Sequence, residues 1–478
     1  MINEVKIEKL VFGGNGLGYI KGRPLDDVQD KPFGKTHGRP VFVPKSVPGD
    51  EFVIEIVKDK KDFAEGIIKK IVKPSPQRIK PPCSYFEQCG GCEHQNISYP
   101  DQLKFKEQIF KDILSKSKLS CHSDPLIGGE ESQLESEILR RPALQDDIKV
   151  LPITAGSDQP FFYRNSIRFF FLELPDSAIS FARRHFRSDR GLVPIKSCLL
   201  QSETCNQILN DLAAYINENI EDKKSLWQLK IREGKQTNEF MVEIITTFEE
   251  LPQKEGIVDV LKKIDSIKSV YHTVTPGKSL KNMRRHLIYG SPIIHEKIGK
   301  YIFQISPESF FQTNSLGVKT LYDKIKEFAD IQMGDRILDL YCGTGTIGIY
   351  LSALAKNVVG VESVPEAIRD AADNAKINKV SNINFFYQDS TEYISSTETV
   401  FNKIILDPPR RGLDKKLIST ISKMKFDNLV YVSCNPGTFA RDIKLFENNG
   451  LKLIKVQPVD MFPQTHHLEV VGQLQRKV

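Results

Sequence analysis

The sequence predicts an α/β protein of three parts: a small β-barrel at residues 1–73, a mixed α+β domain at 74–300, and a Rossmann-like, doubly wound domain at 301–478. Three observations support this prediction. The chain has 478 residues, which is too long for one hydrophobic core. The first part alternates polar and apolar positions over short stretches that end in glycine or proline turns. The last third alternates short apolar strands with segments of helix length, as doubly wound domains do.

The composition is that of a water-soluble globular protein, with 40% hydrophobic and 27% charged residues. No apolar run approaches the roughly 18 residues of a membrane span, and the amino terminus lacks the apolar core of a signal peptide. We therefore expect a cytoplasmic monomer that does not bind membranes. In that compartment, eight cysteines suit metal binding or catalysis better than disulfides.

The amino-terminal barrel is predicted from alternation at residues 4–10 and 51–57, with a glycine-rich turn at 13–18. Small barrels of the OB type often bind nucleic acid. Residues 1–80 hold 16 Lys and Arg against 11 Asp and Glu, which is most of the net charge of +6. This excess favours a polyanionic partner, although a solvated lysine-rich surface explains it equally well.

A C-x5-C-x2-C motif follows, formed by Cys83, Cys89 and Cys92. The two glycines before the last cysteine let the backbone fold tightly around a ligated centre. A fourth thiolate would complete the ligand set. The candidates are Cys121, Cys198 and Cys205. The spacing alone fits a zinc site and an iron–sulfur cluster equally well.

The middle domain begins with apolar side chains at helical spacing over residues 101–116, which predicts an amphipathic helix. Residues near 118–155 show no clean periodicity and are predicted to form a surface insert. Strand patterns return at 162–171, 227–250 and 270–276.

Basic and aromatic side chains interleave over residues 164–196. Four of the arginines lie close together in sequence: Arg183, Arg184, Arg187 and Arg190. This pattern suits stacking on bases and pairing with phosphates. A sheet with one solvated face is the alternative explanation.

The last third shows a strand at 336–340 that runs into a glycine turn, with a helix behind it. Gly343 and Gly345 allow a ligand to approach the backbone at the start of that helix. Glu362 ends the next strand, where a carboxylate can accept hydrogen bonds from ribose hydroxyls. The pattern therefore predicts a nucleotide-like cofactor at this edge of the sheet.

A thiol stands at the end of a later strand, because residues 429–433 lead into the turn Ser433-Cys434-Asn435-Pro436. Ligands of open α/β sheets bind outside the carboxyl ends of the strands. A thiol there can attack an electrophilic carbon if a neighbouring group accepts its proton. A buried structural cysteine is the commoner outcome, so Cys434 needs supporting residues.

The complete set of motifs resembles the S-adenosylmethionine-dependent RNA uracil-5-methyltransferases, in particular the iron–sulfur branch that methylates large-subunit ribosomal RNA. The resemblance covers most of the chain outside the insert. It rests on C-x5-C-G-G-C at 83–92, F-F-Q-T-N at 310–314, L-D-L-Y-C-G at 338–343, D-P-P-R at 407–410, S-C-N-P at 433–436 and H-L-E at 467–469. It implies that the amino-terminal barrel is a TRAM domain that binds RNA.

The resemblance also implies two cofactors. A 4Fe–4S cluster would be held by Cys83, Cys89, Cys92 and Cys198, the last of which stands in a Lys-x-Cys context. S-adenosylmethionine would be contacted by Gln312, Tyr341, Glu362, Asp389 and Asp407. Asp407 would also lie near the target base, whereas Cys342 is a small packing residue.

The implied reaction begins with addition of Cys434 to carbon-6 of uracil, which makes carbon-5 nucleophilic enough to take the methyl group. A base must then remove the carbon-5 proton. Glu469 is the preferred candidate for this base, and His466 and His467 are the alternatives. The target base must be flipped out of a duplex or lie in a loop. The cluster has no evident redox step and is interpreted as a structural or RNA-positioning element.

Other activities fit the motifs less well. Amino-group methyltransferases usually carry Asn-Pro-Pro-aromatic where this chain has Asp407-Pro408-Pro409-Arg410, and cytosine-5 enzymes usually place proline before the cysteine. Radical enzymes use C-x3-C-x2-C. A non-catalytic RNA-binding or assembly factor would not need Cys434 and Glu469. Among substrates, 23S ribosomal RNA is favoured over transfer RNA, because the cluster motif accompanies ribosomal substrates in most bacterial relatives.

Overall fold

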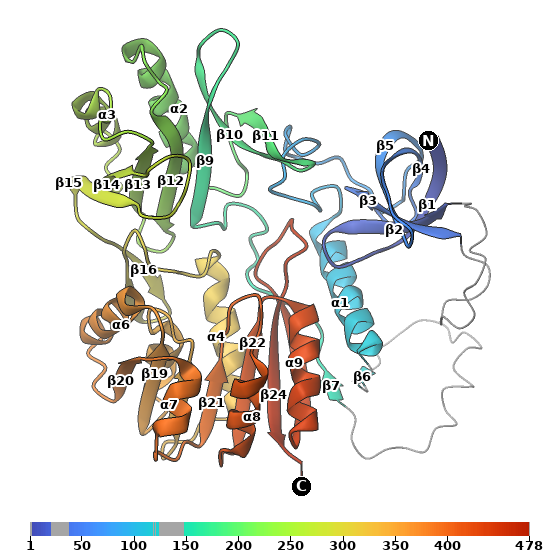
Figure 1. Cartoon of the computed structure of the whole chain (residues 1–478), viewed down its shortest axis with the longest axis vertical. Helices are drawn as coiled ribbons and strands as arrows, with labels where there is room; N and C mark the ends of the chain where they lie inside the picture. Colours follow the sequence, from blue (N-terminus) through green and yellow to red (C-terminus); the bar gives the residue numbers. More distant parts are fainter. Residues whose placement is uncertain (1, 21–37, 118, 120, 124–147, 478) are drawn as a thin grey trace.

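The computed structural model describes the chain except residues 1, 21–37, 118, 120, 124–147 and 478, and of 121–123 and 188–190 it describes the backbone alone. Most of the predicted surface insert therefore lies outside the described residues. Figure 1 shows a small barrel and a central sheet side by side above a large sheet flanked by helices. Within the described part, none of the helices is long and apolar enough to cross a membrane.

The amino-terminal strands close into a barrel in the order β1-β2-β3-β5-β4, as predicted. They are β1 (Ile2–Leu10), β2 (Asn15–Ile20), β3 (Arg39–Pro44), β4 (Glu51–Asp59) and β5 (Ala64–Lys73). Alternate side chains fill the interior, among them Ile7, Val41 and Ile54, which are fully buried. Gly18 lets β1 and β2 approach closely, since a Cβ there would lie 2.5 Å from the Lys6 carbonyl oxygen.

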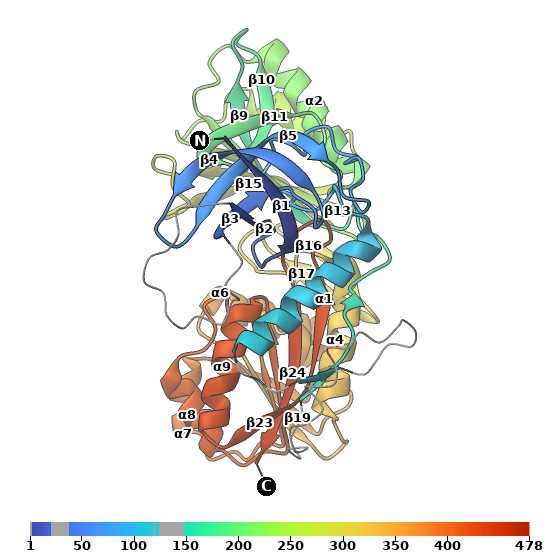
Figure 2. The same ribbon diagram turned by 90° about the vertical axis from the view of Figure 1, so that its right-hand side faces the viewer.

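The predicted amphipathic helix is α1 (Tyr99–Lys116). Ser98 begins it by accepting a hydrogen bond from the Asp101 amide. Its buried face includes Phe110, which packs on Phe439 of α9 (Pro436–Asn448). The helix thus runs from the barrel down onto the large sheet's helical layer (Figure 2).

The central domain is a seven-stranded sheet in the order β11-β10-β9-β12-β13-β14-β15. Its strands are β9 (Ser166–Glu173), β10 (Ile179–His185), β11 (Ser188–Ile195), β12 (Leu226–Gly234), β13 (Glu239–Thr246), β14 (Ile267–Val274) and β15 (Arg284–Gly290). Helices α2 (Glu203–Asn219) and α3 (Lys254–Leu261) pack on it through a shared apolar core. The predicted strand regions thus form one sheet.

The carboxyl-terminal domain is doubly wound, as predicted, around a sheet in the order β20-β19-β18-β21-β22-β24-β23-β7-β6. Its main strands are β18 (Arg336–Leu340), β19 (Asn357–Glu362), β20 (Ile383–Tyr387), β21 (Lys403–Leu406), β22 (Asn428–Ser433), β23 (Leu451–Asp460) and β24 (Glu469–Arg476). Its helices besides α9 are α4 (Ser315–Ala329), α5 (Thr346–Ser352), α6 (Pro365–Ile377), α7 (Ser390–Ser396) and α8 (Lys415–Lys423). Strands β18 to β22 are parallel, and β24 returns antiparallel to β22.

Several short strands lie near the predicted insert or near the predicted border between the second and third parts. Three short strands near the predicted insert, β6 (Cys121–Ser123), β7 (Ile148–Val150) and β8 (Thr154–Ala155), extend the large sheet beyond β23. The hairpin of β16 (Ile294–Ile298) and β17 (Tyr301–Ile305) spans the predicted border at residue 300. Strands of two or three residues are too short to show a period, which is why the sequence pattern missed them.

Candidate active site

The proposed nucleophile and base lie at one edge of the large sheet. Cys434 follows the end of β22, and Glu469 begins β24. The last pair of the antiparallel ladder is Ser433 with Val470, so Cys434 directly follows that pair on one chain segment and Glu469 directly precedes it on the other. The carboxyl ends of the parallel strands meet at this edge, where ligands of such sheets bind.

Glu469 is almost completely buried, with 2% of its surface exposed. Burial raises the pKa of its carboxyl group to about 8, and the charge of Asp407 acts in the same direction. Arg410 opposes the shift. At neutral pH this carboxyl group is therefore mostly protonated in the free protein, and its deprotonated form is a strong acceptor for a proton from carbon.

The Cys434 thiol is half-buried. Burial raises its pKa to about 11, and the negative charges of Glu469 and Asp407 add to the effect, while Arg410 lowers it. The thiol is therefore protonated in the free protein, and it needs a nearby group to accept its proton before it can attack. Asn435 fixes the turn behind it by accepting a hydrogen bond from the Gly437 amide at 2.9 Å.

Two further carboxyl groups stand at the same strand ends. Burial raises the pKa of Asp407 to about 6. Burial and then the charge of Asp407 raise the pKa of Asp339 to about 8, even though Asp339 accepts a hydrogen bond from the Gly348 amide at 3.0 Å. Carboxyl groups held at raised pKa gain most from a cation, which makes this edge suited to a positively charged cofactor.

The loop after β18 has the shape expected of a cofactor site. Tyr341 and Gly343 both adopt positive φ, 63° and 53°, so the backbone turns sharply there. Glu362, at the end of β19, accepts hydrogen bonds from the amides of Gly343 at 3.2 Å and Ser363 at 2.7 Å. The carboxylate thus ties the two strand ends together at the position where a ribose is expected.

The other two predicted cofactor residues have local roles as well. Asp389 is exposed and caps α7 by accepting a hydrogen bond from the Thr391 amide at 2.8 Å. Gln312 lies between β17 and α4, and its carbonyl accepts a hydrogen bond from the Asn165 side chain at 2.8 Å. The backbone of Gln312 therefore links the central domain to the carboxyl-terminal domain.

Arg410 was not singled out from the sequence, although it belongs to the Asp-Pro-Pro-Arg motif. Its guanidinium lies 3.2 Å from a ring nitrogen of His467. Burial, with the charges of His466 and Arg410, lowers the pKa of His467 to about 3. His467 is thus neutral and weakly basic, which favours Glu469 as the base. The signal available in the sequence was the position of Arg410, three residues after Asp407.

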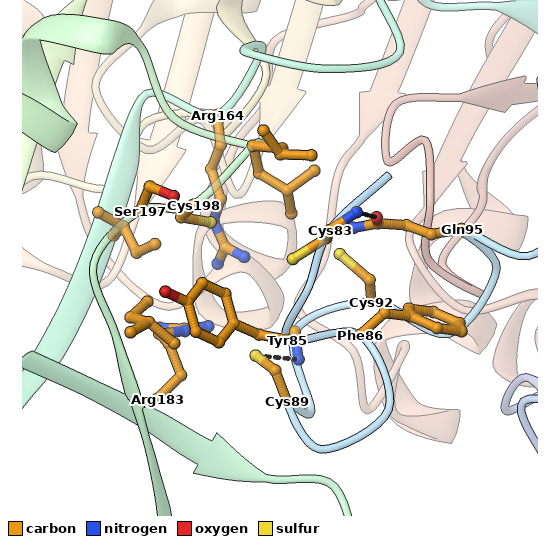
Figure 3. A pocket seen from close by; sticks show the side chains of 15 residues that line it. Cys83, Tyr85, Phe86, Cys89, Cys92, Gln95, Arg164, Arg183, Ser197 and Cys198 are labelled. Atoms are coloured by element: carbon orange, nitrogen blue, oxygen red, sulfur yellow. Dashed lines mark hydrogen bonds between the residues drawn. The ribbon is translucent and has the colours of Figure 1, made fainter. Parts of the chain in front are cut away.

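A second candidate site is a cavity of about 30 Å³ into which four thiols converge (Figure 3). Cys83, Cys89 and Cys92 reach it from the motif, and Cys198 reaches it from the segment after β11. Cys205 lies in the first turn of α2 and is instead buried in the apolar core between that helix and the central sheet. Cys121 lies in β6 at the far edge of the large sheet, and its side chain is outside the described residues.

Positive charge surrounds this cavity. Arg164 and Arg183 line it, and Lys45 of the barrel donates a hydrogen bond to the Cys89 carbonyl at 3.1 Å. Burial raises the pKa of Cys83 and Cys198, so the thiols need such compensation to ionise. Among the described residues, no group of three or more His, Cys, Asp or Glu side chains is arranged to hold a single metal ion.

The arginine-rich segment forms the β10–β11 hairpin beside this cavity. Arg184 and Arg187 are exposed and lie over the rings of Phe170 and Phe186, at 5.0 Å and 4.7 Å. Arg183 points inward and donates a hydrogen bond to the Arg168 carbonyl at 2.6 Å. The side chain of Arg190 is outside the described residues. Two of the four arginines of the hairpin are therefore exposed to solvent, and each packs against an aromatic ring.

Comparison with known proteins gives a consistent assignment. The sequence model of the tRNA (uracil-5-)-methyltransferase family matches residues 186–477, and that of the TRAM domain matches residues 2–69. An uncharacterized RNA methyltransferase of Halalkalibacterium halodurans is 33% identical over 99% of this chain and 97% of its own. One from Bacillus cereus (strain ATCC 10987) is 35% identical over 92% of this chain and 93% of its own.

Among solved structures, the chain is similar to the tRNA (uracil-54, C5)-methyltransferase of Pyrococcus abyssi in complex with S-adenosyl-L-homocysteine. The TM-score is 0.72 at 29% identity, and the match covers 98% of this chain and 99% of the other. The similarity therefore includes the barrel, the central sheet and the doubly wound domain together.

Proposed function

Because the chain belongs to the tRNA (uracil-5-)-methyltransferase family, we propose that it transfers a methyl group from S-adenosylmethionine to carbon-5 of a uridine through a covalent adduct on Cys434. It is an S-adenosylmethionine-dependent RNA methyltransferase with an amino-terminal TRAM domain. The observation that supports the covalent route best is that Cys434 and Glu469 adjoin the same end pair of the β22–β24 ladder, at the carboxyl edge of the sheet.

The proposed reaction has two stages. The Cys434 thiol first gives its proton to water, and the thiolate adds to carbon-6. The displaced electron pair makes carbon-5 a nucleophile that takes the methyl group from the sulfonium, releasing S-adenosylhomocysteine. Glu469 then takes the proton from carbon-5. The electron pair left behind restores the double bond between carbon-5 and carbon-6, and the sulfur of Cys434 leaves.

The surrounding charges support these roles. Burial raises the pKa of Cys434, and the positive charge of Arg410 partly offsets that rise, which favours the thiolate. The raised pKa of Glu469 makes it a far stronger base than His467. The carboxyl group of Asp407 lies within electrostatic reach of both, which suits contact with a cationic sulfonium on one side and with the base on the other.

Methyl transfer to RNA from cells that lack the protein tests this function. With labelled S-adenosylmethionine, the label should appear as 5-methyluridine in digests of that RNA, and Cys434→Ala should transfer none. Label recovered as an amino-group or ribose methyl would refute the proposed reaction.

We further propose 23S ribosomal RNA as the substrate, because the cysteine motif at 83–92 resembles that of the ribosomal branch. Transfer RNA is the second candidate, favoured by the similarity to the Pyrococcus abyssi enzyme along nearly the whole chain. Mapping 5-methyluridine separately in the two RNA classes from cells without the protein distinguishes them, since the missing modification identifies the substrate.

We also propose that Cys83, Cys89, Cys92 and Cys198 hold a 4Fe–4S cluster. The convergence of four thiols from two segments on one cavity supports this set. One zinc ion would draw its thiolates to within about 4 Å of each other, whereas a cluster of four irons binds thiolates that stand farther apart. Arg164 and Arg183 would balance the negative charge of the ligated thiolates. When bound, the cluster cross-links the two segments and supplies structural order.

A further inference from the structure

The loop of residues 461–468 joins β23 to β24 and leads directly into Glu469. In Figure 1 this red loop rises above β24 toward the upper end of α1. Several of its contacts are with residues that follow the cysteine motif and with α1, which lie hundreds of positions away in the sequence. Because the loop leads into Glu469, these contacts help to fix the position of the Glu469 carboxylate.

Gln464 is the centre of these contacts. Its carbonyl accepts hydrogen bonds from the amides of Glu93 at 3.0 Å and His94 at 3.1 Å. Its φ is 69°, a left-handed conformation that is unfavourable for a residue other than glycine. Such a conformation persists only where the surroundings impose it.

Gln102 of α1 holds Gln464 from the other side. Its Nε2 donates a hydrogen bond to Gln464 Oε1 at 2.9 Å, and its Oε1 accepts one from the Gln464 amide at 2.9 Å. The same Nε2 lies 3.0 Å from the carbonyl oxygen of His94. Gln102 is 1% exposed, so these bonds have little competition from water.

Both ends of the loop are anchored as well. Before it, Lys106 pairs with Asp460 at 2.7 Å and donates a hydrogen bond to the Phe462 carbonyl at 3.0 Å, and both charges are buried. After Gln464, the His466 amide donates a hydrogen bond to Glu93 Oε2 at 3.2 Å. The loop is thus held along its length up to three residues before Glu469.

We infer that Gln102 is a positioning residue for the second stage of the reaction: through Gln464 it holds the loop that sets the carboxylate of Glu469 against carbon-5. This inference rests on the proposed covalent mechanism. Cys434 is carried by β22 and the start of α9, whereas Gln102 acts on the loop that precedes β24. Loss of Gln102 should therefore slow proton removal more than addition of the thiol.

The test compares Gln102→Ala with wild type on total RNA from cells that lack the protein. We expect turnover to fall on the order of 10- to 100-fold, as displacement of a catalytic group by about 1 Å can cause. KM for the RNA should not change, and a methylated protein–RNA adduct that survives denaturing electrophoresis should accumulate. Hydrogen exchange at the Gln464 amide should become faster.

Gln108→Ala is the matched control, because Gln108 is on the same helix and its side chain donates a hydrogen bond to Asp112 instead. It should behave as wild type. Gln102→Glu keeps an acceptor for the Gln464 amide and should accumulate an intermediate amount of adduct. If Gln102→Ala does not bind S-adenosylmethionine, the variant is misfolded and the amount of adduct in Gln102→Glu tests the inference instead.

Glu469→Gln is run in parallel to separate the inference from the mechanism beneath it. If Glu469→Gln accumulates the adduct and neither Gln102 variant does, the role of Gln102 is refuted and the mechanism stands. If Glu469→Gln accumulates none, the proposed mechanism fails first. Wild-type turnover in both Gln102 variants, or equal slowing of addition and release, also overturns the inference.

Discussion

Cys434 and Glu469 each adjoin the last residue pair between two neighbouring antiparallel strands, because the ladder of β22 and β24 ends with Ser433 opposite Val470. A rigid sheet therefore sets the spacing between the two groups. The negative charge of Glu469 also raises the pKa of Cys434, so the base and the nucleophile influence each other before any substrate binds. The two residues can nevertheless be separated by experiment, since they act at different stages.

Glu469→Gln should trap the reaction after methyl transfer. The amide is nearly the same shape but cannot accept the carbon-5 proton, so a methylated protein–RNA complex should accumulate and survive denaturing electrophoresis. Cys434→Ala should bind RNA and cofactor yet form no complex, and adding it to Glu469→Gln should abolish the trapped species, a non-additive result expected of sequential steps. Wild-type turnover by Glu469→Gln, or an adduct mapped to Cys342 by mass spectrometry, would contradict these roles.

Much of this arrangement could be predicted from the sequence where the signal is local. The strand ends that carry Glu362, Asp407 and Cys434 follow from short apolar runs, and the sheet brings them together as its topology requires. The position of Glu469 rested on a motif resemblance, because β24 enters the sheet antiparallel after a long connection. The bond between Gln102 and Gln464 joins residues 362 positions apart, and no local pattern could reveal it.

The four cysteines predict an iron stoichiometry. Protein purified without oxygen should be brown and carry about four iron atoms per chain. Cys198→Ser should lose the iron, because it removes one of the thiols that line the cavity. Cys205→Ala is the control, since that thiol is on α2 and packs into the apolar core, so its loss should leave the iron content unchanged. Stoichiometric zinc without iron would refute the cluster.

RNA binding should depend steeply on salt, and the β10–β11 hairpin should contribute to it. Replacing Arg184 and Arg187 by alanine should reduce the slope of log affinity against log salt concentration by roughly 2, since each phosphate contact releases about one counterion. Binding of S-adenosylmethionine should stay constant. Lys423→Ala with Lys425→Ala changes two exposed lysines at the opposite edge of the large sheet and should leave the slope unaltered. Equal slopes for both pairs would exclude the hairpin from the interface.

The buried carboxyl group of Glu469 should also make stability depend on pH. Its pKa is about 8 in the folded protein, against an ordinary value of 4.5. Below pH 4.5 both folded and unfolded states hold the proton. Between these two values the folded state binds more protons than the unfolded state, so the free energy of unfolding falls as pH rises. Glu469→Gln removes this titration, and its stability relative to wild type should increase from acid toward pH 9.

Thermal unfolding at several pH values measures this difference. The Tm of Glu469→Gln minus that of wild type should rise between pH 5 and pH 9, in spite of the activity lost by the variant. Glu366→Gln, which changes a partly exposed carboxylate on α6 paired with Arg369, should show a constant difference over the same range. A constant difference for Glu469→Gln too would mean that its carboxyl group is not held at a raised pKa, and the argument for it as the base would lose its electrostatic support.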